Sequence, residues 1–542
     1  MDTITGDKKN IMYIFNDAIF GGAGQSLLDS LKELKKEVNP IVIIRQGIKI
    51  KDSFKALGLH CYEIRFSTDY VEIGSITEEK KASDFKQSYE AACQLVSIIK
   101  KEKIQVIHIN SSSTYFAAIA ALMTNVPFVC HIRELMEEQF GCEFLNAELR
   151  MSLYIRADKL ISISDYVRQT YYEKYNLDTQ RIYNGLDVGK FKLDIKENKG
   201  YNNVFLAAAM IMPEKGQWDA ICAVEKLVKQ GYSDVKLIIA GTGADEYIWI
   251  LKKYVIKKKL DKNIAILPFQ KDLSELRRKA DYAITCSQNE ALGRVTIESM
   301  FAGNVLIGAK SGGTIEIIGE NEERGFLYEL HNSDDLASTM LRAMQCPSEA
   351  KDRLLKEAQK YVESTFDPKK YCRKILDVYD EVIASHESKN HDKFLSELEQ
   401  KYELMKNTEI CESHSINNRQ IKAETALWLA IKWLELKQEG KNLAEYFIRN
   451  HMQSVAIYGM AALGRRLYDE LENSGVEIKY LLDRNPNGME KILQFTSLDK
   501  ERLEVDVIVV TVAAAEREIV KEIQDMGYEK VIGLSDILDD YI

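Results

Sequence analysis

Residues 282–303 read YAITCSQNEALGRVTIESMFAG, the pattern of a strand, a polar loop and a helix. The apolar run Tyr282–Thr285 has the length and composition of a buried parallel strand, and a polar stretch follows it. Glu290 is then expected in a loop and Glu298 on the next helix. In α/β sheets built from such strand–loop–helix units, ligands bind beyond the carboxyl ends of the strands. The stretch therefore predicts one ligand-binding unit of a Rossmann-like sheet.

The same alternation of strands and helices continues on both sides of this stretch. An upstream series of strands is predicted at Ile11–Phe15, Ile41–Ile44, Val106–Ile109, Val126–Cys130 and Lys159–Ile163, with helices such as Ser26–Lys36 and Ser88–Lys101. A second series is predicted at Val204–Ala209, Val235–Ala240, Ile264–Leu267, Tyr282–Thr285 and Val305–Gly308, with helices Gln217–Lys229 and Asp245–Lys259. The chain is thus expected to be α/β, with two facing Rossmann-like domains at residues 1–195 and 196–385, joined near 187–201. The last helix of the second domain is expected to pack back on the first.

The remaining chain predicts a helical connector at 386–450 and a third, small Rossmann-like domain at 451–542. The connector carries an apolar patch at Ala426–Leu436, so docking or homo-oligomerisation is an alternative to a plain linker. In the small domain, Val455–Tyr458, Ile478–Leu482, Val507–Val510 and Lys530–Ile532 are expected strands. A turn at Gly459–Gly464 is expected to lead into a helix at Arg465–Glu472.

Gly459 and Gly464 are two of the three glycines of a dinucleotide-binding turn, with Ala461 at the middle position. Asp483 ends the second strand of this domain, where an acidic side chain can hold a ribose. A nucleotide site is one interpretation of the pattern, and a structural or interaction domain is the favoured one. The segment resembles small Rossmann-like domains of bacterial sugar acyltransferases and methyltransferases.

Composition narrows the classes of partner. A net charge of -10 disfavours nucleic acid, which is held by clustered lysine and arginine. Nine scattered cysteines without a C-x-x-C pair indicate neither a zinc site nor a disulfide framework. No signal peptide and no apolar run long enough to cross a membrane are found, so a cytoplasmic location is expected. The lysines of 252–262 are interpreted as a solvated face, with peripheral contact to anionic lipid on the inner face of the plasma membrane as the alternative.

Four further features suggest a diphosphate site, each with a plain structural alternative. The turn at residues 21–26, GGAGQS, would open a helix whose free N–H groups suit an anion. Lys215, at another strand-to-helix turn, has the charge to neutralise a diphosphate. Backbone N–H groups near Leu292, Gly293 and Arg294 would face a phosphate, and Glu298 has oxygens for two ribose hydroxyls. Singly, each is equally a surface residue or an ordinary turn.

In this order, the motifs resemble glycosyltransferase family 4, the retaining GT-B glycosyltransferases, over roughly residues 10–385. The matching segments are the Gly-Gly-Ala turn, Asn184-Gly-Leu-Asp187, Pro213-Glu-Lys-Gly216, the glycines Gly241 and Gly243, Glu290 with Glu298, Gly312-Gly313, Glu316-Ile-Ile318 and Gly325. The resemblance implies a nucleoside-diphosphate sugar as donor, retention of anomeric configuration, and no cofactor or metal. It implies transfer of a hexosyl or N-acetylhexosaminyl unit to a glycan or lipid-linked acceptor in surface polysaccharide or glycoconjugate synthesis.

The resemblance also implies roles for single residues. Gly22 would approach the donor phosphates, Lys215 would bind the diphosphate, Glu290 would contact the transferred sugar and Glu298 would hold the ribose. Leu292 and Gly293 would donate backbone N–H groups, and His131 would lie near the reacting sugar. The family commonly has a second diphosphate-binding arginine where this chain has Met210. Lys215 would then neutralise more of the diphosphate charge, or Arg294 would substitute for that arginine. A GT-B epimerase acting on a UDP-sugar and a catalytically weak sugar-nucleotide-binding scaffold are the competing hypotheses.

Overall fold

The computed structural model describes residues 8–16, 22–48, 50–187, 202–387, 391–407, 412–486, 488–498 and 502–541. The side chains of residue 407 and of residues 412–424 are outside this description. The chain divides into two compact units: Met1–Thr242 with Leu260–Ile410, and Gly243–Lys259 with Cys411–Ile542. The predicted domain join at 187–201 falls largely on residues 188–201, and Gly21 of the first glycine turn is likewise outside the described residues.

The first sheet of the larger unit has the strand order β3-β2-β1-β5-β6-β8-β9, and its described strand pairs are all parallel. Its strands are β1 Lys9–Phe15, β2 Val38–Arg45, β3 His60–Ile64, β5 Val106–Ile109, β6 Phe128–Ile132, β8 Lys159–Ser162 and β9 Gln180–Arg181. Its helices are α1 Gly22–Leu34, α2 Lys51–Ala56, α3 Glu78–Lys101, α4 Phe116–Thr124, α5 Met136–Phe140, α6 Ala147–Tyr154 and α7 Asp165–Tyr175. Two short strands, β4 Tyr70–Glu72 and β7 Cys142–Phe144, form an antiparallel pair. We call this sheet and its helices the N-terminal half.

The second sheet has the order β12-β11-β10-β13-β14-β15 and is also parallel. Its strands are β10 Val204–Ala208, β11 Lys236–Ala240, β12 Ile264–Leu267, β13 Tyr282–Thr285, β14 Val305–Ala309 and β15 Phe326–Tyr328. The accompanying helices are a single turn η2 Pro213–Lys215, α8 Gln217–Lys229, α10 Ser274–Lys279, α11 Arg294–Phe301, α12 Gly313–Ile318, α13 Ser333–Gln345 and α14 Ser348–Thr365. We call this part the donor half, after the role that the sequence resemblance implies for it. Two Rossmann-like sheets of this kind confirm the predicted fold class.

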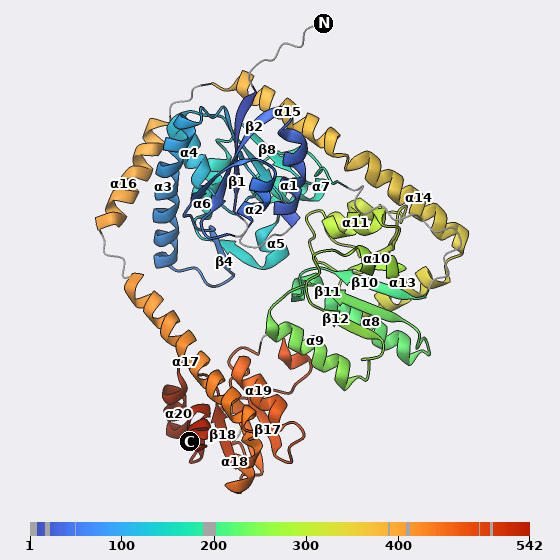
Figure 1. Cartoon of the computed structure of the whole chain (residues 1–542), viewed down its shortest axis with the longest axis vertical. Coiled ribbons are helices and arrows are strands. Elements are labelled where there is room, and N and C mark those ends of the chain that lie inside the picture. Colours follow the sequence, from blue (N-terminus) through green and yellow to red (C-terminus); the bar gives the residue numbers. More distant parts are fainter. Residues whose placement is uncertain are drawn as a thin grey trace. The chain divides into compact units, whose positions relative to one another are not determined.

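Helix α15, Pro368–Ser385, returns from the donor half and packs beside α1 (Figure 1). The hydroxyl of Tyr379 on this helix lies 2.7 Å from Nδ1 of His108 and 2.9 Å from the hydroxyl of Tyr13. Gly185 makes the return feasible, because a Cβ at this position would lie 2.8 Å from Cα of Pro368. This close approach gives a structural reason for the glycine in the Asn-Gly-Leu-Asp motif.

The predicted connector at 386–450 divides between the two units. Helix α16, Asp392–Asn407, lies beside α3, and Tyr402 stacks on Tyr89 with 4.6 Å between ring centroids (Figure 1). Helices α17 Glu412–Gln438 and α18 Leu443–Arg449 belong to the smaller unit. In that unit α17 contacts α21, and α18 contacts both α19 and α21. The connector is therefore two packed segments, since each helix buries apolar side chains on a neighbour.

The smaller unit contains a parallel sheet of order β17-β16-β18-β19. Its elements are β16 Ser454–Tyr458, α19 Ala462–Leu471, β17 Glu477–Leu482, η3 Met489–Lys491, β18 Val507–Val510, α20 Glu516–Asp525, β19 Val531–Gly533 and α21 Leu534–Asp539. The turn predicted at Gly459–Gly464 is shorter in the structure, because α19 begins at Ala462 and contains Gly464. A Cβ on Gly464 would lie 1.8 Å from the carbonyl oxygen of Gly459, so close packing of helix on strand requires this glycine.

Helix α9, Asp245–Lys257, follows β11 in sequence, yet it is grouped with the smaller unit, where it meets α19. Lys253 pairs with Asp469 at 2.6 Å and with Glu472 at 2.7 Å. Arg465, whose side chain is 7% exposed, pairs with Glu246 at 3.0 Å. Lys253 of the 252–262 stretch is thus paired with acidic side chains of α19. Contact of this stretch with lipid stays a prediction.

Two predicted helices begin earlier than expected. Helix α1 starts at Gly22 and not at Ser26, because packing of its buried face outweighs the poor helix propensity of glycine. Helix α3 starts at Glu78 and not at Ser88, because the hydroxyl oxygen of Thr77 accepts from the N–H of Lys80 and caps the helix. Within the described ranges, no helix is both long and apolar enough to cross a bilayer.

Candidate active site

Lys215 and Glu290 form an ion pair at the carboxyl edge of the donor-half sheet. Nζ of Lys215 lies 2.7 Å from Oε2 of Glu290, and the two side chains are 9% and 15% exposed. Lys215 ends the turn after β10, and Glu290 lies in the loop after β13, a neighbouring strand in the sheet. The sheet order therefore brings together two predicted site residues that are 75 positions apart. Their exclusion from water strengthens the electrostatic interaction between them and any bound charge.

Glycines hold both sides of this pair in place. Gly216, at φ +65°, packs so tightly that a Cβ would lie 2.4 Å from the carbonyl oxygen of Cys286. A Cβ on Gly312 would lie 2.6 Å from the backbone N of Glu290. The N–H of Gly313 donates to the carbonyl oxygen of Glu290 at 2.6 Å. Close backbone approach thus explains the glycines that flank the two charged residues.

We expect Gly216→Ala to destabilise the donor half by about 2–5 kcal/mol. The estimate adds roughly 1–2 kcal/mol for a left-handed residue with a side chain to about 1–3 kcal/mol for overpacking. Gly231→Ala is a matched control, because Gly231 also has positive φ but no atom within 4 Å of its Cβ position. Thermal unfolding should show a clearly larger loss for Gly216→Ala, and equal losses would contradict the role of the Cys286 contact.

Glu298 is held between two arginines. Its Oε2 lies 2.5 Å from Arg277 Nη2, and its Oε1 lies 2.7 Å from Arg294 Nε. Arg277 is 2% exposed and comes from α10, whose sequence SELRRK gave no signal for a buried arginine. Each carboxylate oxygen accepts more than one hydrogen bond, so Glu298 retains acceptor capacity for ribose hydroxyls.

Arg294 continues this chain of charges into the N-terminal half. Its Nη2 lies 2.7 Å from Oδ2 of Asp29, and its Nη1 lies 3.1 Å from Oγ of Ser26, both on α1. Burial would raise the pKa of Asp29, but the charge of Arg294 and hydrogen bonds from Lys32 and Arg294 hold that pKa below its usual value. Arg294 is therefore engaged in joining the halves, and at the position of the family's second arginine the exposed Met210 offers no charge.

The boundary between the N-terminal half and the donor half, which we call the seam, has two helix starts beside it. These helix starts contain Gly22, Leu292 and Gly293. Gly22 is exposed at the first position of α1, and no atom lies within 4 Å of its Cβ position. Ser26 and Asp29, which contact Arg294, lie further along the same helix. Gly293, at φ +85°, caps α11, and Leu292 before it is 3% exposed. The start of α1 thus faces the part of the donor half that carries Arg294.

His131, at the end of β6, lies in a fully buried polar network. Its Nδ1 is 3.2 Å from Arg133 Nη2 and 3.3 Å from His108 Nε2, and its ring stacks on Tyr371. Burial, with the charge of Arg133 and the adjacent ring of His108, holds the pKa of His131 well below its usual value, so the ring is neutral. Its Nε2 is buried without a hydrogen-bond partner among the described residues. A role beside the sugar therefore stays a prediction that rests on Nε2.

In the smaller unit, the predicted nucleotide-binding residues have structural partners. Asp483 accepts the N–H of Met460 through Oδ2 at 2.6 Å and the N–H of Asn485 through Oδ1 at 2.8 Å. A Cβ on Gly459 would lie 2.5 Å from Cγ2 of Val512. These contacts fix the loop after β16, and a nucleotide site at Gly459, Gly464 and Asp483 stays a prediction.

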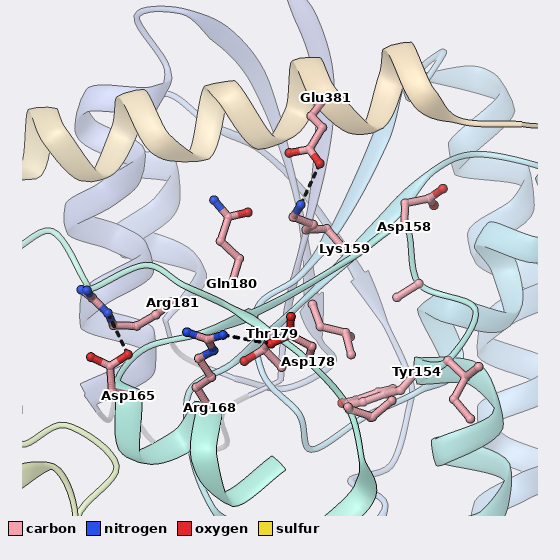
Figure 2. A pocket seen from close by; sticks show the side chains of 14 residues that line it. Tyr154, Asp158, Lys159, Asp165, Arg168, Asp178, Thr179, Gln180, Arg181 and Glu381 are labelled. Atoms are coloured by element: carbon pink, nitrogen blue, oxygen red, sulfur yellow. Dashed lines mark hydrogen bonds and ion pairs between the residues drawn. The ribbon is translucent and has the colours of Figure 1, made fainter. Parts of the chain in front are cut away.

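A groove of about 740 Å³ lies at the β9 edge of the first sheet and contains none of the predicted site residues (Figure 2). Six of its charged side chains are paired with one another: Lys159 with Glu381, Arg168 with Asp178 and Arg181 with Asp165 (Figure 2). Among the described residues, no group of three or more histidine, cysteine, aspartate and glutamate side chains is arranged to hold a metal ion. The candidate active site is instead the seam between the two halves, where Lys215, Glu290 and Glu298 lie.

Family models match both halves of the larger unit. The model described as Glycosyltransferase Family 4 matches residues 20–190, and that described as Glycosyl transferases group 1 matches residues 190–361. The chain is a GT-B glycosyltransferase. Both matches end before the smaller unit of this glycosyltransferase begins its main segment at Cys411.

Individual relatives agree with this assignment. A UDP-Gal:alpha-D-GlcNAc-diphosphoundecaprenol alpha-1,3-galactosyltransferase of Escherichia coli is 23% identical over 310 residues, which are 54% of this chain and 79% of that one. The solved structure of Anabaena HepE with UDP and glucose has a TM-score of 0.56 and 20% identity, and the match covers 68% of this chain and 99% of that one. A glycosyltransferase from Rickettsia africae has a TM-score of 0.57 and 19% identity, covering 70% and 100%.

Proposed function

We propose that this glycosyltransferase moves a hexosyl or N-acetylhexosaminyl unit from a nucleoside-diphosphate sugar, a UDP-sugar in the first instance, to a glycan or lipid-linked acceptor. The proposal is supported by two carboxylates at the seam that are each held by basic side chains. Glu290 forms an ion pair with Lys215, and Glu298 forms ion pairs with Arg277 and Arg294. The galactosyltransferase of Escherichia coli, which by its name uses a UDP-sugar and a diphosphoundecaprenol-linked acceptor, supports the choice of substrates. Synthesis of surface polysaccharide or glycoconjugate is the setting that this acceptor class suggests.

In the proposed reaction, the bond between the anomeric carbon and the diphosphate oxygen breaks, and negative charge builds on the leaving diphosphate. An acceptor hydroxyl oxygen forms the new bond to the anomeric carbon, and the proton of that hydroxyl passes to the leaving diphosphate. Lys215 stabilises this charge together with the N–H groups at the starts of α1 and α11, near Gly22 and Gly293. Glu290 keeps Lys215 oriented and contacts hydroxyls of the transferred sugar, while Glu298 holds the ribose. We propose retention of configuration without a metal ion, as in the family that the motifs resemble.

Closure of the two halves is the second requirement of this mechanism. Water in the seam would hydrolyse the donor, so transfer needs a site from which water is excluded. In the structure, Arg294 spans to Asp29, and Ser164 of the N-terminal half donates to the carbonyl oxygen of Ala291 at 2.5 Å. These contacts border the loop that carries Glu290, and we propose that closure of the two halves also assembles the site.

Ligand stabilisation tests the donor site. We expect one or more members of a panel of UDP-, GDP- and ADP-sugars to raise the thermal midpoint by about 5 °C or more at 100 times the Kd. Glu298→Ala should reduce that shift, measured against its own ligand-free midpoint, because loss of charged hydrogen bonds weakens binding about 10- to 100-fold. Glu320→Ala, at an exposed residue of the same half, is the matched control.

Product analysis separates this proposal from its competitors. Release of nucleoside diphosphate with the sugar on an acceptor supports transfer, whereas an intact, isomerised donor would indicate an epimerase. Binding without either product would indicate a scaffold. Equal donor shifts in Glu298→Ala and the wild type would contradict the proposed ribose contact.

A further inference from the structure

A short helix of the N-terminal half reaches the Lys215–Glu290 pair. Helix α5, Met136–Phe140, follows β6 and ends at Gly141, which has φ +61°. A Cβ on Gly141 would lie 3.9 Å from Oε1 of Glu214, next to Lys215. Nζ of Lys215 lies 5.7 Å from the centroid of the Phe140 ring. The end of α5 therefore covers the turn that carries the proposed diphosphate-binding lysine.

Gln139 on this helix contacts Glu290 directly. Its Nε2 lies 3.2 Å from Oε1 of Glu290, whose other oxygen receives Lys215. A carboxylate only accepts hydrogen bonds, so the amide nitrogen must face Glu290 and the amide oxygen must face elsewhere. The orientation of the amide thus follows from its partner.

The amide oxygen of Gln139 is the unexplained atom of this contact. Gln139 is 5% exposed, and its Oε1 is buried with no hydrogen-bond partner in the part of the chain that the structure describes. Glu214 Oε2, on the turn that α5 covers, is buried and unpartnered in the same sense. Buried acceptors without donors are costly, and such atoms call for an explanation.

The chemistry of these two oxygens narrows the group that would satisfy them. Both are acceptors, so a phosphate, which also presents acceptor oxygens, does not fit. A hydroxyl does, because it supplies a proton to an amide or carboxylate oxygen. The transferred sugar is the polyhydroxyl part of the proposed donor, and Glu290, which Gln139 touches, is the residue proposed to contact it.

We propose that Gln139 is a sugar-contacting, specificity-determining residue: its Oε1 accepts a hydrogen bond from one hydroxyl of the transferred sugar while its Nε2 orients Glu290. The N-terminal half would thereby take part in choosing the donor sugar. The alternative is that Gln139 only joins the two halves. This inference rests on the proposed function, and the experiment distinguishes a failure of this inference from a failure of the proposed function.

The test crosses a Gln139 variant with altered donors. Wild type, Gln139→Met and the control Gln169→Met, at an exposed glutamine of α7, are assayed with UDP-glucose, UDP-galactose and UDP-N-acetylglucosamine. For the donor that the wild type uses, analogues lacking one sugar hydroxyl each are then compared by kcat and KM. Gln139→Asn provides the same comparison if the methionine variant does not fold.

We expect one analogue to lower kcat/KM of the wild type and of Gln169→Met about 10- to 100-fold. Gln139→Met should lower kcat/KM with the parent donor by a similar factor and should show almost no further loss with that analogue, since the contact is already gone. If every analogue causes the same loss in Gln139→Met as in the wild type, Gln139 touches no sugar hydroxyl and the inference is overturned. If the wild type turns over none of the donors with any acceptor tried, the proposed function fails first.

Discussion

Lys215→Ala is expected to lower kcat about 100- to 1,000-fold while changing KM for the donor much less. The ammonium group stabilises charge that develops on the diphosphate as the sugar departs, and removing one such preorganised contact costs about this factor. The effect should lie at the upper end here, because Met210 stands where a second cation would share the charge, and Arg294 is engaged by Asp29 and Glu298. Steady-state kinetics, with the donor identified by ligand stabilisation, measures this loss of kcat.

Two further variants show whether the loss of kcat comes from the loss of the charge at this position. Lys215→Arg keeps the charge and should recover part of the activity, whereas Lys100→Ala, at an exposed lysine of α3, should leave the rate unchanged. A kcat for Lys215→Ala within about twofold of the wild type would remove the lysine from the proposed mechanism, since an interaction used in the transition state must appear in kcat.

Breaking the Arg294–Asp29 contact is expected to lower kcat/KM about 100-fold. Asp29 is 2% exposed at its side chain and Arg294 is 12% exposed, so loss of either partner leaves a poorly solvated charge. It also loosens the closure that aligns donor and acceptor, and small misplacements of reacting groups cost about this factor. Asp29→Ala and Arg294→Ala test the two ends of the contact.

The double variant provides the internal check. If closure is what both residues supply, Asp29→Ala with Arg294→Ala should be little worse than either single variant, because contacting residues are not additive. Asp52→Ala, at an exposed aspartate of α2, serves as the control. Losses that simply multiply in the double variant would show that the two residues act separately.

The pH dependence of this contact has a definite sign. Because the pKa of Asp29 is held below its usual value in the folded protein, its ionised form contributes stability above the ordinary carboxyl pKa of about 4. The contribution is lost as the pH falls through the lower, folded-state value. The contact should therefore persist from neutral pH to about pH 4 and weaken in more acidic solution.

Much of the sheet architecture was predictable because parallel strands buried on both faces are short apolar runs. Ile264–Leu267 and Val507–Val510, for example, were predicted with their exact bounds. Helix starts were less predictable, because packing allowed α1 to begin within a glycine-rich stretch. The pairing of Lys215 with Glu290 depends on β10 and β13 being neighbours, which no local pattern specifies.

The residues that sequence reasoning missed are polar side chains buried by tertiary contacts. Arg277 and Arg278 are adjacent in a basic helix, but only Arg277 is buried and paired with Glu298. Gln139 lies in a short helix with glutamates and gave no signal of contact with a residue 151 positions away. The grouping of α9 with the smaller unit was missed for the same reason, because its partners on α19 lie more than 200 positions further along the chain.

A crystal structure of the chain with UDP bound is the decisive test of the proposed donor site. We predict the diphosphate within hydrogen-bond distance of Lys215 Nζ and the ribose hydroxyls on the Glu298 carboxylate, both in one nucleotide at the seam of the two halves. Density for UDP at any other place, with the Lys215–Glu290 and Glu298–arginine contacts unchanged and no ligand atom beside them, would contradict it.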